Sequence, residues 1–496
     1  MPNIAVLGGG LSGLTSALVL SRKLPSARIQ LYESSDRFGG WIHSISPDKG
    51  HGSVFDLGPH SGRIGTPTSS ASLELMGSLE MKKGDMLWLK KTSPAAKRYI
   101  YWRNDLVPVK FISTQKQQPF TRSPLQAIFK ALFKKNKKLS SKEDDLSVDE
   151  FLRTRLDAEF ADFLGSALMR GIFAGDSRKL SIRAALPLMS EIDSRKGNFI
   201  LNAAKELLWP KKTSQDLQID QVLKALFPET KCIKPPRGSF AWGFPRGMQT
   251  LTDAIFQELA QNANVELIPS CSVERVSSGS KLSVYLKGRN EAQNFDAVFS
   301  SLPSHNYKNF LPNSVLENLE EDGRKLTQMD WANVGICVVQ LSGKIKLKKP
   351  AFGHLVPREE DDTILGVIYD SVAFPQLDDP EKKTTRFTVM MDGNKFIKRE
   401  IGANKTLIAE AACLALKNHL SIDCFHEHPP VCIHTDVLFN CIPQYPVYHC
   451  NHVESLRKTI NEHAPNFYVS GLSYDGVSVN DVIFSSMNQV YSFMNK

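Results

Sequence analysis

The pattern of apolar and polar positions predicts a compact supersecondary unit at the start of the chain. Residues 4–7 are an apolar run that leads into the glycines of 8–13. The next apolar residues recur at the spacing of one helix face: Leu14, Ala17, Leu18 and Leu20. Residues 28–32 form a second apolar run. This order predicts a strand, a tight turn, a helix and a second strand, which together make a βαβ unit.

The following long stretch has a different pattern. Residues 86–228 are rich in Lys and largely helical in their periodicity, with candidate helices at 149–168, 186–192 and 219–226. Residues 248–262 then form an amphipathic helical pattern, and 265–268 and 295–299 read as strands. These last segments predict a return of the chain to the first unit.

The rest of the chain alternates between apolar and polar residues. Segments at 335–341, 363–369, 386–391 and 431–439 predict a mixed sheet, which a helix at 407–420 covers. Residues 467–470 predict a last strand, which runs into Gly471 and then into a helix that begins near Val479 or Asn480. We therefore expect an α/β protein with a discontinuous Rossmann-like domain (1–85, 233–303 and 440–496), a helical domain (86–232) and a mixed-sheet domain (304–439).

Length, charge and cysteine usage narrow the class of protein. A chain of 496 residues is long enough for two or three domains and a buried cofactor. The eight cysteines lack CxxC or zinc-ligand spacing, so we expect free thiols and neither a metal site nor a disulfide scaffold. They are Cys232, Cys271, Cys337, Cys413, Cys424, Cys432, Cys441 and Cys450.

The net charge of +9 is concentrated at one place. An apolar stripe of Leu125, Ile128, Phe129, Leu132 and Phe133 runs beside Lys130, Lys134, Lys135, Lys137 and Lys138. This pattern is typical of an amphipathic helix on an anionic membrane, although a solvated loop with a short packed helix explains it equally well. We expect no nucleic-acid partner.

The longest uncharged apolar stretch, 334–341, is far shorter than the roughly 20 residues that span a bilayer, so we expect any membrane attachment to be peripheral. The first strand begins at Asn3 or Ile4 and leaves no room for a signal peptide or a presequence. We therefore expect any import signal to be internal.

Glycines and one carboxylate carry the clearest chemical signal. Gly8, Gly10 and Gly13 suit a tight turn, a close approach of the backbone to a pyrophosphate and close packing of helix on strand. Glu33 ends the second strand, where its carboxylate can accept hydrogen bonds from the ribose hydroxyls and disfavours a 2′-phosphate. Glu33, Arg37 and the pair Gly39–Gly40 also resemble the E-x-x-x-R-x-G-G signature of amine-oxidase-like flavoproteins. The two motifs together favour FAD over NAD or NADP.

A second glycine-rich strand–turn–helix unit is missing from the sequence, so the flavin must be reduced by the substrate itself. Molecular oxygen is the simplest acceptor, and hydrogen peroxide is then the by-product. The flavin performs the hydride chemistry and the protein binds, orients and desolvates. The sequence contains no Ser/His/Asp or Cys/His nucleophile set. Arg63, His60 and His354 are catalytic candidates, but a lone His is usually structural, so we assign no catalytic residue and no general base.

Several longer segments resemble one family, the animal mitochondrial protoporphyrinogen oxidases. The resemblance runs from the first strand to the last helix and is weakest at 82–163 and 194–232. It rests on residues 57–59, 170–175 with 177–183, 352–357, 369–375, 441–445 and 471–481. The resemblance implies an amine-oxidase-like fold with a helical membrane-binding domain. It also implies the six-electron oxidation of protoporphyrinogen IX by oxygen, in heme biosynthesis, on the outer face of the inner mitochondrial membrane. A homodimer and a contact with ferrochelatase are the family expectation.

The same resemblance implies the residues of the site. Non-covalent FAD would contact Gly8, Gly9, Gly10, Leu11, Ser12, Gly13, Glu33, Ser34, Trp41, Gly58, Pro59, His60, Ser61, Val273, Leu472, Val477, Ser478 and Val479. Arg98 would bind a propionate of the substrate, because an Arg can hold a carboxylate by two parallel hydrogen bonds. Gly171 would leave room for the macrocycle. The walls of its site would be Phe352, Leu355, Ile368 and Met390.

Two departures from the family pattern lie at the predicted cofactor site. His60–Ser61 stand where the family commonly has Arg-Gly, and Phe484–Ser486 stand where it has an acid and Ser-Gly. The alternatives are an amine or polyamine oxidase, a coproporphyrinogen oxidase, and a catalytically silent FAD-binding protein that carries a tetrapyrrole. Against the first, residues 466–496 contain no Cys of the kind that holds covalent flavin.

Overall fold

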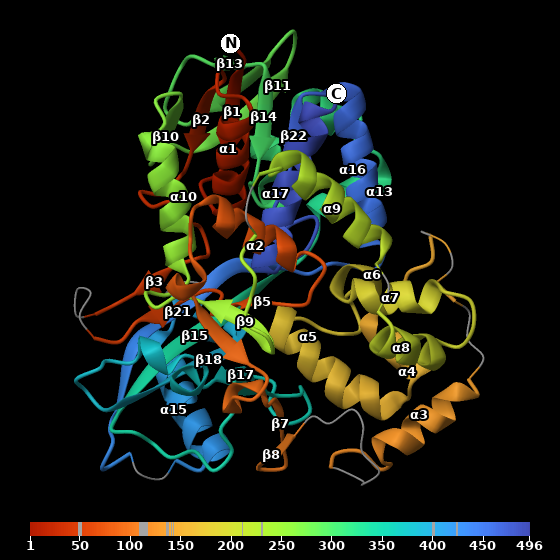
Figure 1. Ribbon diagram of the computed structural model, residues 1–496, viewed down its shortest axis with the longest axis vertical. Coiled ribbons are helices and arrows are strands. Elements are labelled where there is room, and N and C mark those ends of the chain that lie inside the picture. Colours follow the sequence, from red (N-terminus) through yellow and green to blue (C-terminus); the bar gives the residue numbers. More distant parts are fainter. Residues whose placement is uncertain are drawn as a thin grey trace.

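The computed structural model describes residues 1–47, 52–108, 118–134, 138, 139, 141, 143–210, 212–229, 232–398, 402–422 and 425–496. Lys135, Lys137 and Cys424, which the sequence analysis names, lie outside these residues. Figure 1 shows three regions: a sheet with helices at the top, a second sheet at the lower left, and a group of helices at the lower right. Both ends of the chain lie at the top.

The upper region is built on a five-stranded parallel sheet. Its strand order is β10 (Val265–Ile268), β2 (Arg28–Tyr32), β1 (Asn3–Leu7), β14 (Ala297–Ser300) and β22 (Phe467–Val469). β1 lies in the middle, and its residues Ile4–Leu7 are completely buried. A strand that is buried on both faces needs an unbroken apolar run, which explains why residues 4–7 contain no polar side chain.

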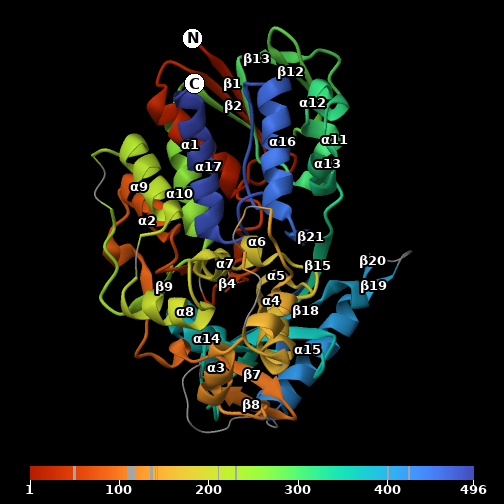
Figure 2. The ribbon, with the colours of Figure 1, turned by 90° about the vertical axis from the view of Figure 1, so that its right-hand side faces the viewer.

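Helices cover one face of this sheet. Figure 2 shows α1 (Leu11–Lys23) beside α17 (Val479–Met494), and α10 (Gln249–Gln261) packs next to α1. The other face carries the three-stranded sheet of β11 (Val273–Ser278), β12 (Leu282–Leu286) and β13 (Gln293–Phe295), together with α16 (His449–His463). The remaining helices of this region are α2 (Ser69–Ser78), α9 (Ser214–Leu226), α11 (Tyr307–Phe310), α12 (Asn313–Glu317) and α13 (Glu321–Thr327).

The lower sheet is mixed and has seven strands. Its order is β21 (Pro430–Pro443), β15 (Trp331–Ser342), β18 (Thr384–Asp392), β17 (Ile364–Ile368), β16 (Gly353–Leu355), β7 (Tyr99–Trp102) and β8 (Asp105–Pro108). All neighbours are antiparallel except β16 and β7. α15 (Lys405–Leu420) covers one face and confirms the predicted covering helix. The opposite face of the sheet is turned toward α5 (Ser166–Phe173).

The structure corrects the predicted secondary structure at the start of the helical segment. Residues 86–108 begin the segment that was expected to be largely helical, but they form β6 (Leu87–Lys90), β7 and β8. β6 pairs with β9 (Ser239–Gly243), which also pairs with β5 (Gly62–Arg63), and β7 and β8 extend the seven-stranded sheet. The reason lies in the sequence of β7: the run Tyr99–Trp102 is aromatic and β-branched and lacks a helical period.

The predicted helix at 149–168 is divided in the structure. α4 (Val148–Arg155) ends before Asp157, whose carboxylate accepts the N–H of Phe160 and starts a π-helical turn, Phe160–Gly165, that continues into α5. The other helices of this region are α3 (Pro124–Leu132), α6 (Ile182–Ala185), α7 (Pro187–Ser194) and α8 (Phe199–Leu208). Short elements complete the fold: β3 (Ser44–Ile45), β4 (Phe55–Asp56), β19 (Ile397–Lys398), β20 (Gly402–Ala403) and α14 (Asp370–Ala373). None of the helices in the described residues is both long and apolar enough to cross a membrane.

Candidate cofactor and substrate site

The glycine-rich turn joins β1 to α1 at the carboxyl end of the parallel sheet. Gly8 adopts a left-handed conformation (φ +96°), which a side chain would strain. Gly13 is the contact between helix and strand, since a Cβ there would collide with the carbonyl oxygen of Gly8. Gly10 precedes α1 without a side-chain cap. The turn therefore combines a sharp bend, close helix–strand packing and an open helix N-terminus, as the glycine spacing predicts.

Glu33 lies directly beneath this turn. Its Oε2 accepts the N–H of Gly9 at 2.7 Å, and its Oε1 accepts the N–H of Ser35 at 2.8 Å and the hydroxyl of Ser34 at 3.2 Å. The segment after β10 packs against the same residue, where the N–H of Cys271 reaches the Glu33 carbonyl at 2.7 Å, close to Val273. The structure thus brings Glu33, Ser34 and Val273 to one end of the sheet.

Arg37 shapes the second glycine pair. Its guanidinium donates to the carbonyls of Phe38 and Ile42 at 3.0 Å and of Gly40 at 2.5 Å. The N–H of Gly39 in turn donates to the Gly9 carbonyl at 2.8 Å, which ties this turn to the first. The Arg37 side chain therefore fixes the backbone beside the glycine-rich turn.

The segment after β4 joins the same place. A Cβ at Gly58 would collide with the carbonyl oxygen of Trp41, so residues 58–61 pass directly beside the Gly39–Trp41 turn. Residues 57–59 are one of the resemblance segments, and the absence of a side chain at Gly58 permits this close approach.

The end of the chain closes the site. The hydroxyl of Ser12 lies 2.9 Å from that of Ser470 and 2.8 Å from that of Ser486, so α1, the loop after β22 and α17 meet there. Ser478 caps α17, since its Oγ accepts the N–H of Asp481. In the loop between β22 and α17, the Leu472 carbonyl accepts a hydrogen bond from the Tyr445 hydroxyl. Residues 472–479 are thereby fixed next to the glycine-rich turn.

The residues of this site fit a dinucleotide cofactor in two respects. The N–H groups of Leu11, Ser12 and Gly13 at the start of α1 have no hydrogen-bond partner among the described residues, as a pyrophosphate site at a helix N-terminus requires. The Nε2 atom of His60 is also buried without a partner in the described chain. A bound group that accepts hydrogen bonds would satisfy these atoms.

His60 forms a buried ion pair with Asp370. Its Nδ1 lies 3.0 Å from Asp370 Oδ1, while Thr388 donates to the other carboxylate oxygen at 2.8 Å. Burial disfavours the charged form of His60, but the charge and hydrogen bond of Asp370 outweigh it and raise the pKa of the imidazole. Burial also acts against the Asp370 carboxylate, but His60 and Arg386 hold its pKa below the usual value. The His that stands at position 60, where the family pattern has Arg, is thus a buried ion-pair partner of Asp370.

Arg98 lies at the other side of the site, before β7. Its guanidinium stands over the rings of Phe352 at 4.6 Å and Phe240 at 5.3 Å, and it donates to the Ala95 carbonyl at 2.6 Å. Partial burial and then the charge of Arg63 lower its pKa. No carboxylate of the described residues pairs with Arg98 or with Arg63. Two rings therefore position a guanidinium that no carboxylate of the described chain neutralises.

Arg63 is the residue that the sequence analysis left unassigned. It follows Gly62 in β5, and the next N–H, that of Ile64, donates to the Phe240 carbonyl at 2.9 Å. Its own carbonyl accepts the side chain of Asn480, in the first turn of α17, at 2.9 Å. Arg63 therefore lies between the start of α17 and Phe240, one of the two rings that the Arg98 guanidinium contacts. Only the pairing of β5 with β9 reveals this, and spacing in the sequence gives no sign of it.

Three of the four predicted wall residues share one face of the seven-stranded sheet, while Phe352 lies just before β16 and contacts Arg98. Strand alternation puts Leu355, Ile368 and Met390 on the face opposite α15, each partly exposed. Gly171 of α5 packs onto this face, and the end of the Leu355 side chain occupies the space where its Cβ would be. The structure therefore brings Gly171 and Leu355 into direct contact, and the room beside Gly171 depends on the rotamer of Leu355.

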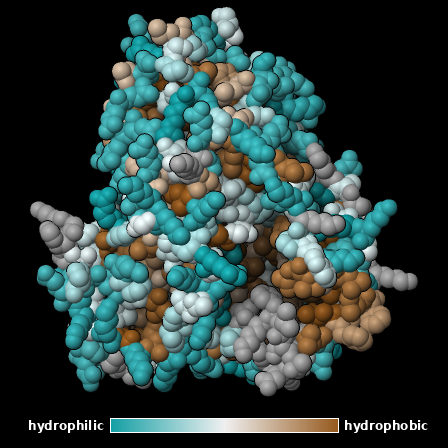
Figure 3. Space-filling view, in the orientation of Figure 1, coloured by the Kyte–Doolittle hydropathy of each residue, from teal (hydrophilic) through white to brown (hydrophobic). Residues whose placement is uncertain are grey.

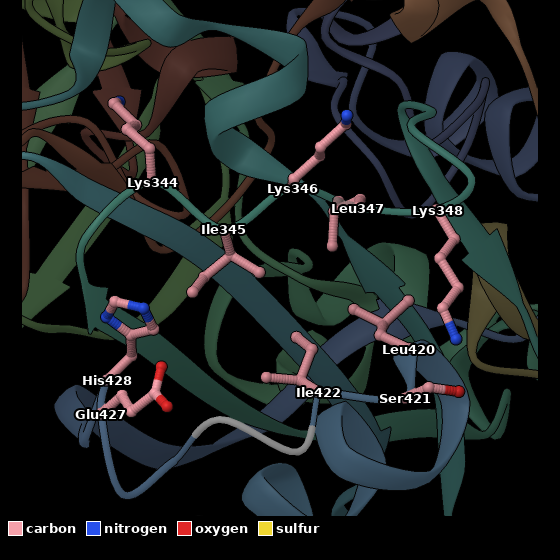
Figure 4. Close-up of a pocket in the computed structure, with 10 residues that line it drawn as sticks. All are labelled: Lys344, Ile345, Lys346, Leu347, Lys348, Leu420, Ser421, Ile422, Glu427 and His428. Atoms are coloured by element: carbon pink, nitrogen blue, oxygen red, sulfur yellow. The ribbon is translucent and has the colours of Figure 1, made fainter.

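Two other features lie away from this site. His354 faces α15, where its ring nitrogens are 2.7 Å from the Tyr369 hydroxyl and 3.0 Å from His419 Nδ1, so it is a structural residue. A surface cavity of about 520 Å³ beyond the end of α15 contains none of the predicted site residues, and its lysines Lys344, Lys346 and Lys348 point in different directions (Figure 4). Within the described ranges, no three His, Cys, Asp or Glu side chains are arranged to hold a metal ion.

Comparisons with known proteins identify the family of the chain. Residues 11–490 match the family model of the flavin containing amine oxidoreductases. The chain is 30% identical to the protoporphyrinogen oxidase of Homo sapiens over 99% of its own length and 98% of the human protein. It is 24% identical to the coproporphyrinogen III oxidase of Staphylococcus aureus over 97% of its length and 96% of that protein. A candidate protoporphyrinogen oxidase from Exiguobacterium sp. 255-15 has a similar fold, with a TM-score of 0.74 at 18% identity over 100% of this chain and 99% of the other.

Proposed function

For a chain that belongs to the flavin-containing amine oxidoreductases and, within them, to the protoporphyrinogen oxidases, we propose the oxidation of protoporphyrinogen IX to protoporphyrin IX. Six electrons leave the substrate in three cycles, oxygen accepts them, and hydrogen peroxide is released. The observation that carries this proposal is Arg98, which has no carboxylate partner among the described residues and is held on two aromatic rings beside an apolar sheet face. A flat, largely apolar molecule with carboxylates on its rim matches that arrangement.

The cofactor is FAD, and when bound it supplies the hydride acceptor. The start of α1 would hold the pyrophosphate, and Glu33 the ribose hydroxyls. Residues 58–61, Leu472 and Val477–Val479 would hold the flavin ring, with the buried Nε2 of His60 as a hydrogen-bond donor to it. These residues bind and orient, and none of them needs to transfer a proton to carbon.

On the substrate side, Arg98 would bind one propionate by two parallel hydrogen bonds. Leu355, Ile368 and Met390 would contact the apolar part of the macrocycle, and Phe352 would hold both Arg98 and the ring edge. We propose that the chain divides at the boundaries expected from its sequence, except that β7 and β8 belong to the substrate region whose sheet they extend.

We propose that the protein is attached to a membrane surface while it carries out this activity. α3 and α8 pack against each other. The side chain of Asn198, the N-cap of α8, donates to the Leu132 carbonyl at the end of α3 at 3.0 Å. These two helices and the residues just after them expose several large apolar side chains, five of which are more than 60% exposed, and Figure 3 shows this hydrophobic area at the lower right. These five residues, the apolar patch from here on, are Phe129 (64% exposed), Phe133 (73%), Leu207 (72%), Leu208 (64%) and Trp209 (70%).

Lysines flank the apolar patch, among them the exposed Lys130 of α3 and Lys205 of α8. A face of aromatic and aliphatic side chains bordered by lysines fits the interface of an anionic bilayer. We therefore propose peripheral attachment through this patch, on the inner mitochondrial membrane and at its intermembrane-space side, with a homodimer as the working unit.

The decisive experiment is anaerobic mixing of FAD-loaded protein with protoporphyrinogen IX, followed by oxygen. We expect the flavin absorbance to bleach, and porphyrin fluorescence and peroxide to rise after oxygen is admitted. A flavin that bleaches only with coproporphyrinogen or only with an amine would replace the proposed substrate. A flavin that stays oxidised with all three while porphyrin still binds would make the protein a silent carrier.

A further inference from the structure

Three cysteine thiols from three different elements lie together in the lower region, away from the candidate site. Cys337 belongs to β15, Cys413 to α15 and Cys432 to β21. The first lies on the sheet face that α15 covers. We call these three residues the thiol cluster. Their convergence has no role in the proposed oxidation, because the candidate site occupies the opposite face of the sheet.

A β-bulge brings Cys432 into the cluster. β21 pairs with β15 so that Thr435 lies opposite Cys337 and Cys432 opposite Val339, with an irregularity between them. Positions 432 and 435 would point to opposite faces in a regular strand, since side chains alternate with a period of two. The extra residue of the bulge reverses this alternation and turns Cys432 toward α15, on the same side as Thr435.

Cys432 is the central member of the cluster. Its thiol interacts with the thiols of both Cys337 and Cys413. Cys337 is completely buried, with its sulfur 3.6 Å from the Thr435 hydroxyl, whereas Cys413 is half-buried and Cys432 is exposed on the edge strand of the sheet. A small oxidant in solution can therefore reach Cys432 first.

The chemical environment also favours Cys432 as the reactive thiol. Hydrogen bonds from Cys337 and then from Cys413 lower its pKa and stabilise the thiolate, whereas the interaction with Cys432 and burial raise the pKa of both neighbours. The thiolate is the nucleophile in reactions with peroxides. An exposed, stabilised thiolate beside a second thiol is the arrangement of a redox-sensitive pair.

We propose that Cys432 and Cys413 form a disulfide when the protein meets hydrogen peroxide. The Cys432 thiolate attacks one peroxide oxygen, the O–O bond breaks, and the hydroxide that leaves takes up a proton to become water. The Cys413 thiol then attacks the resulting sulfenic sulfur, and the S–O bond breaks with loss of a second water. Two thiols and one peroxide thus give one disulfide and two waters.

Cys413 is the partner because it sits on a helix that packs over the strand. Cys337 is not directly opposite Cys432, because Cys432 pairs with Val339 and Cys337 pairs with Thr435. The Cα atoms of such a diagonal pair are about 7–8 Å apart, which is beyond the usual span of a disulfide. The bond would join α15 to the edge strand β21. It would also close the chain between residues 413 and 432, which includes the turn after α15.

The test uses the full-length, FAD-loaded protein after complete reduction and removal of the reductant. The protein is exposed to hydrogen peroxide in slight molar excess, the remaining thiols are alkylated, and peptides are identified by mass spectrometry. Trypsin and chymotrypsin together leave Cys432 as the only cysteine of the peptide 426–438. We expect this peptide to be joined to the one that contains Cys413, with the loss of two free thiols per chain.

Variants separate the three cysteines. Cys337→Ser should retain the cross-link, and Cys413→Ser should lose it and accumulate a sulfinic acid at Cys432. Cys232→Ser, which removes a cysteine outside the cluster, should behave as the unaltered protein. A Cys337–Cys432 cross-link would overturn the proposal, as would a cluster that stays reduced while Cys232 is oxidised.

Because peroxide is added, this test does not depend on the proposed substrate. A second arm generates peroxide by turnover with protoporphyrinogen, with and without catalase. A cross-link that forms with added peroxide but in neither turnover sample would count against the oxidase reaction and leave the thiol pair established.

Discussion

His60 Nδ1 lies 3.0 Å from Asp370 Oδ1, and this one contact joins the segment after β4 to the segment after β17. The first segment approaches the predicted cofactor turn, and the second follows β17, an inner strand of the seven-stranded sheet. Both side chains are buried, at 8% and 9% exposure. The pair is therefore an internal connection between the two regions of the candidate site.

Removing the charge of Asp370 should destabilise the fold. Breaking a buried ion pair costs about 3 kcal/mol, so Asp370→Asn should lower the free energy of unfolding by that amount. Asp362→Asn removes the exposed pair with Lys395 and should cost less than about 1 kcal/mol. Urea unfolding of both variants and the parent protein measures the difference. Equal losses in the two variants would contradict the structural role of the pair.

The stabilisation by this pair should depend on pH. The raised pKa of His60 means that its contribution is complete below the unfolded value of about 6.5 and is lost as pH rises through the folded value. The lowered pKa of Asp370 means that its contribution is present above about 3.9 and is lost as pH falls. The difference between the parent and Asp370→Asn should hence be largest near pH 5 to 6, roughly between these two values. A difference that grows toward pH 9 would reverse the assigned directions.

Glu33 should determine how tightly FAD is held. The carboxylate already accepts the Gly9 N–H, and hydrogen bonds to charged groups contribute about 1.5–3 kcal/mol, so Glu33→Gln should raise the dissociation constant of FAD roughly tenfold or more. Glu266→Gln alters an exposed ion pair with Arg28 and should leave the dissociation constant of FAD unchanged. Titration of the apoprotein with FAD, followed by flavin fluorescence, measures binding without turnover. Unchanged affinity in Glu33→Gln would place the ribose elsewhere.

Arg63 should bind a second carboxylate of the substrate together with Arg98. Arg63→Ala should raise KM about tenfold to a hundredfold with little change in kcat, and Arg63→Lys should restore part of the loss. The dimethyl ester of the substrate lacks the anionic group, so the parent protein and Arg63→Ala should then have similar KM values. An equal defect with acid and ester would show that Arg63 acts on the fold or on the flavin.

The apolar patch should bind lipid. The double variant Phe129→Ser/Phe133→Ser should reduce sedimentation with vesicles of phosphatidylcholine and cardiolipin, because each buried aromatic side chain contributes about 1.5–3 kcal/mol. Leu217→Ser removes an equally exposed apolar residue on α9, outside the patch, and should leave binding unchanged. Equal binding by all three proteins would remove the membrane role of α3.

The first βαβ unit and the mixed sheet could be predicted because their signals are local. Residues 4–7 and 335–341 are buried strands with no competing helical period, and Gly8 and Gly13 occupy positions that only glycine tolerates. The strands β7 and β8 were mistaken for helix, because a lysine-rich composition on both sides concealed a short aromatic run. Periodicity over four residues is too weak to outweigh such a context.

The connections within the site could not be read from the sequence. His60 and Asp370 are 310 positions apart, and their pairing depends on the register of several strands that no local pattern specifies. Arg63 likewise reaches Arg98 only through the pairing of β5 with β9. In contrast, the family resemblance predicted Arg98 and the wall residues, although spacing alone gave no reason to group them.

The hydroxyl contact between Ser12 and Ser486 spans 474 positions. A nascent chain leaves the ribosome from its N-terminus, so the glycine-rich turn emerges long before the helix that closes over it. A protein still in synthesis should therefore expose an incomplete nucleotide pocket, and cofactor loading becomes an event that follows translation. Cellular flavin supply would then influence how many finished chains mature and how many are degraded, without any change in the rate at which they are made.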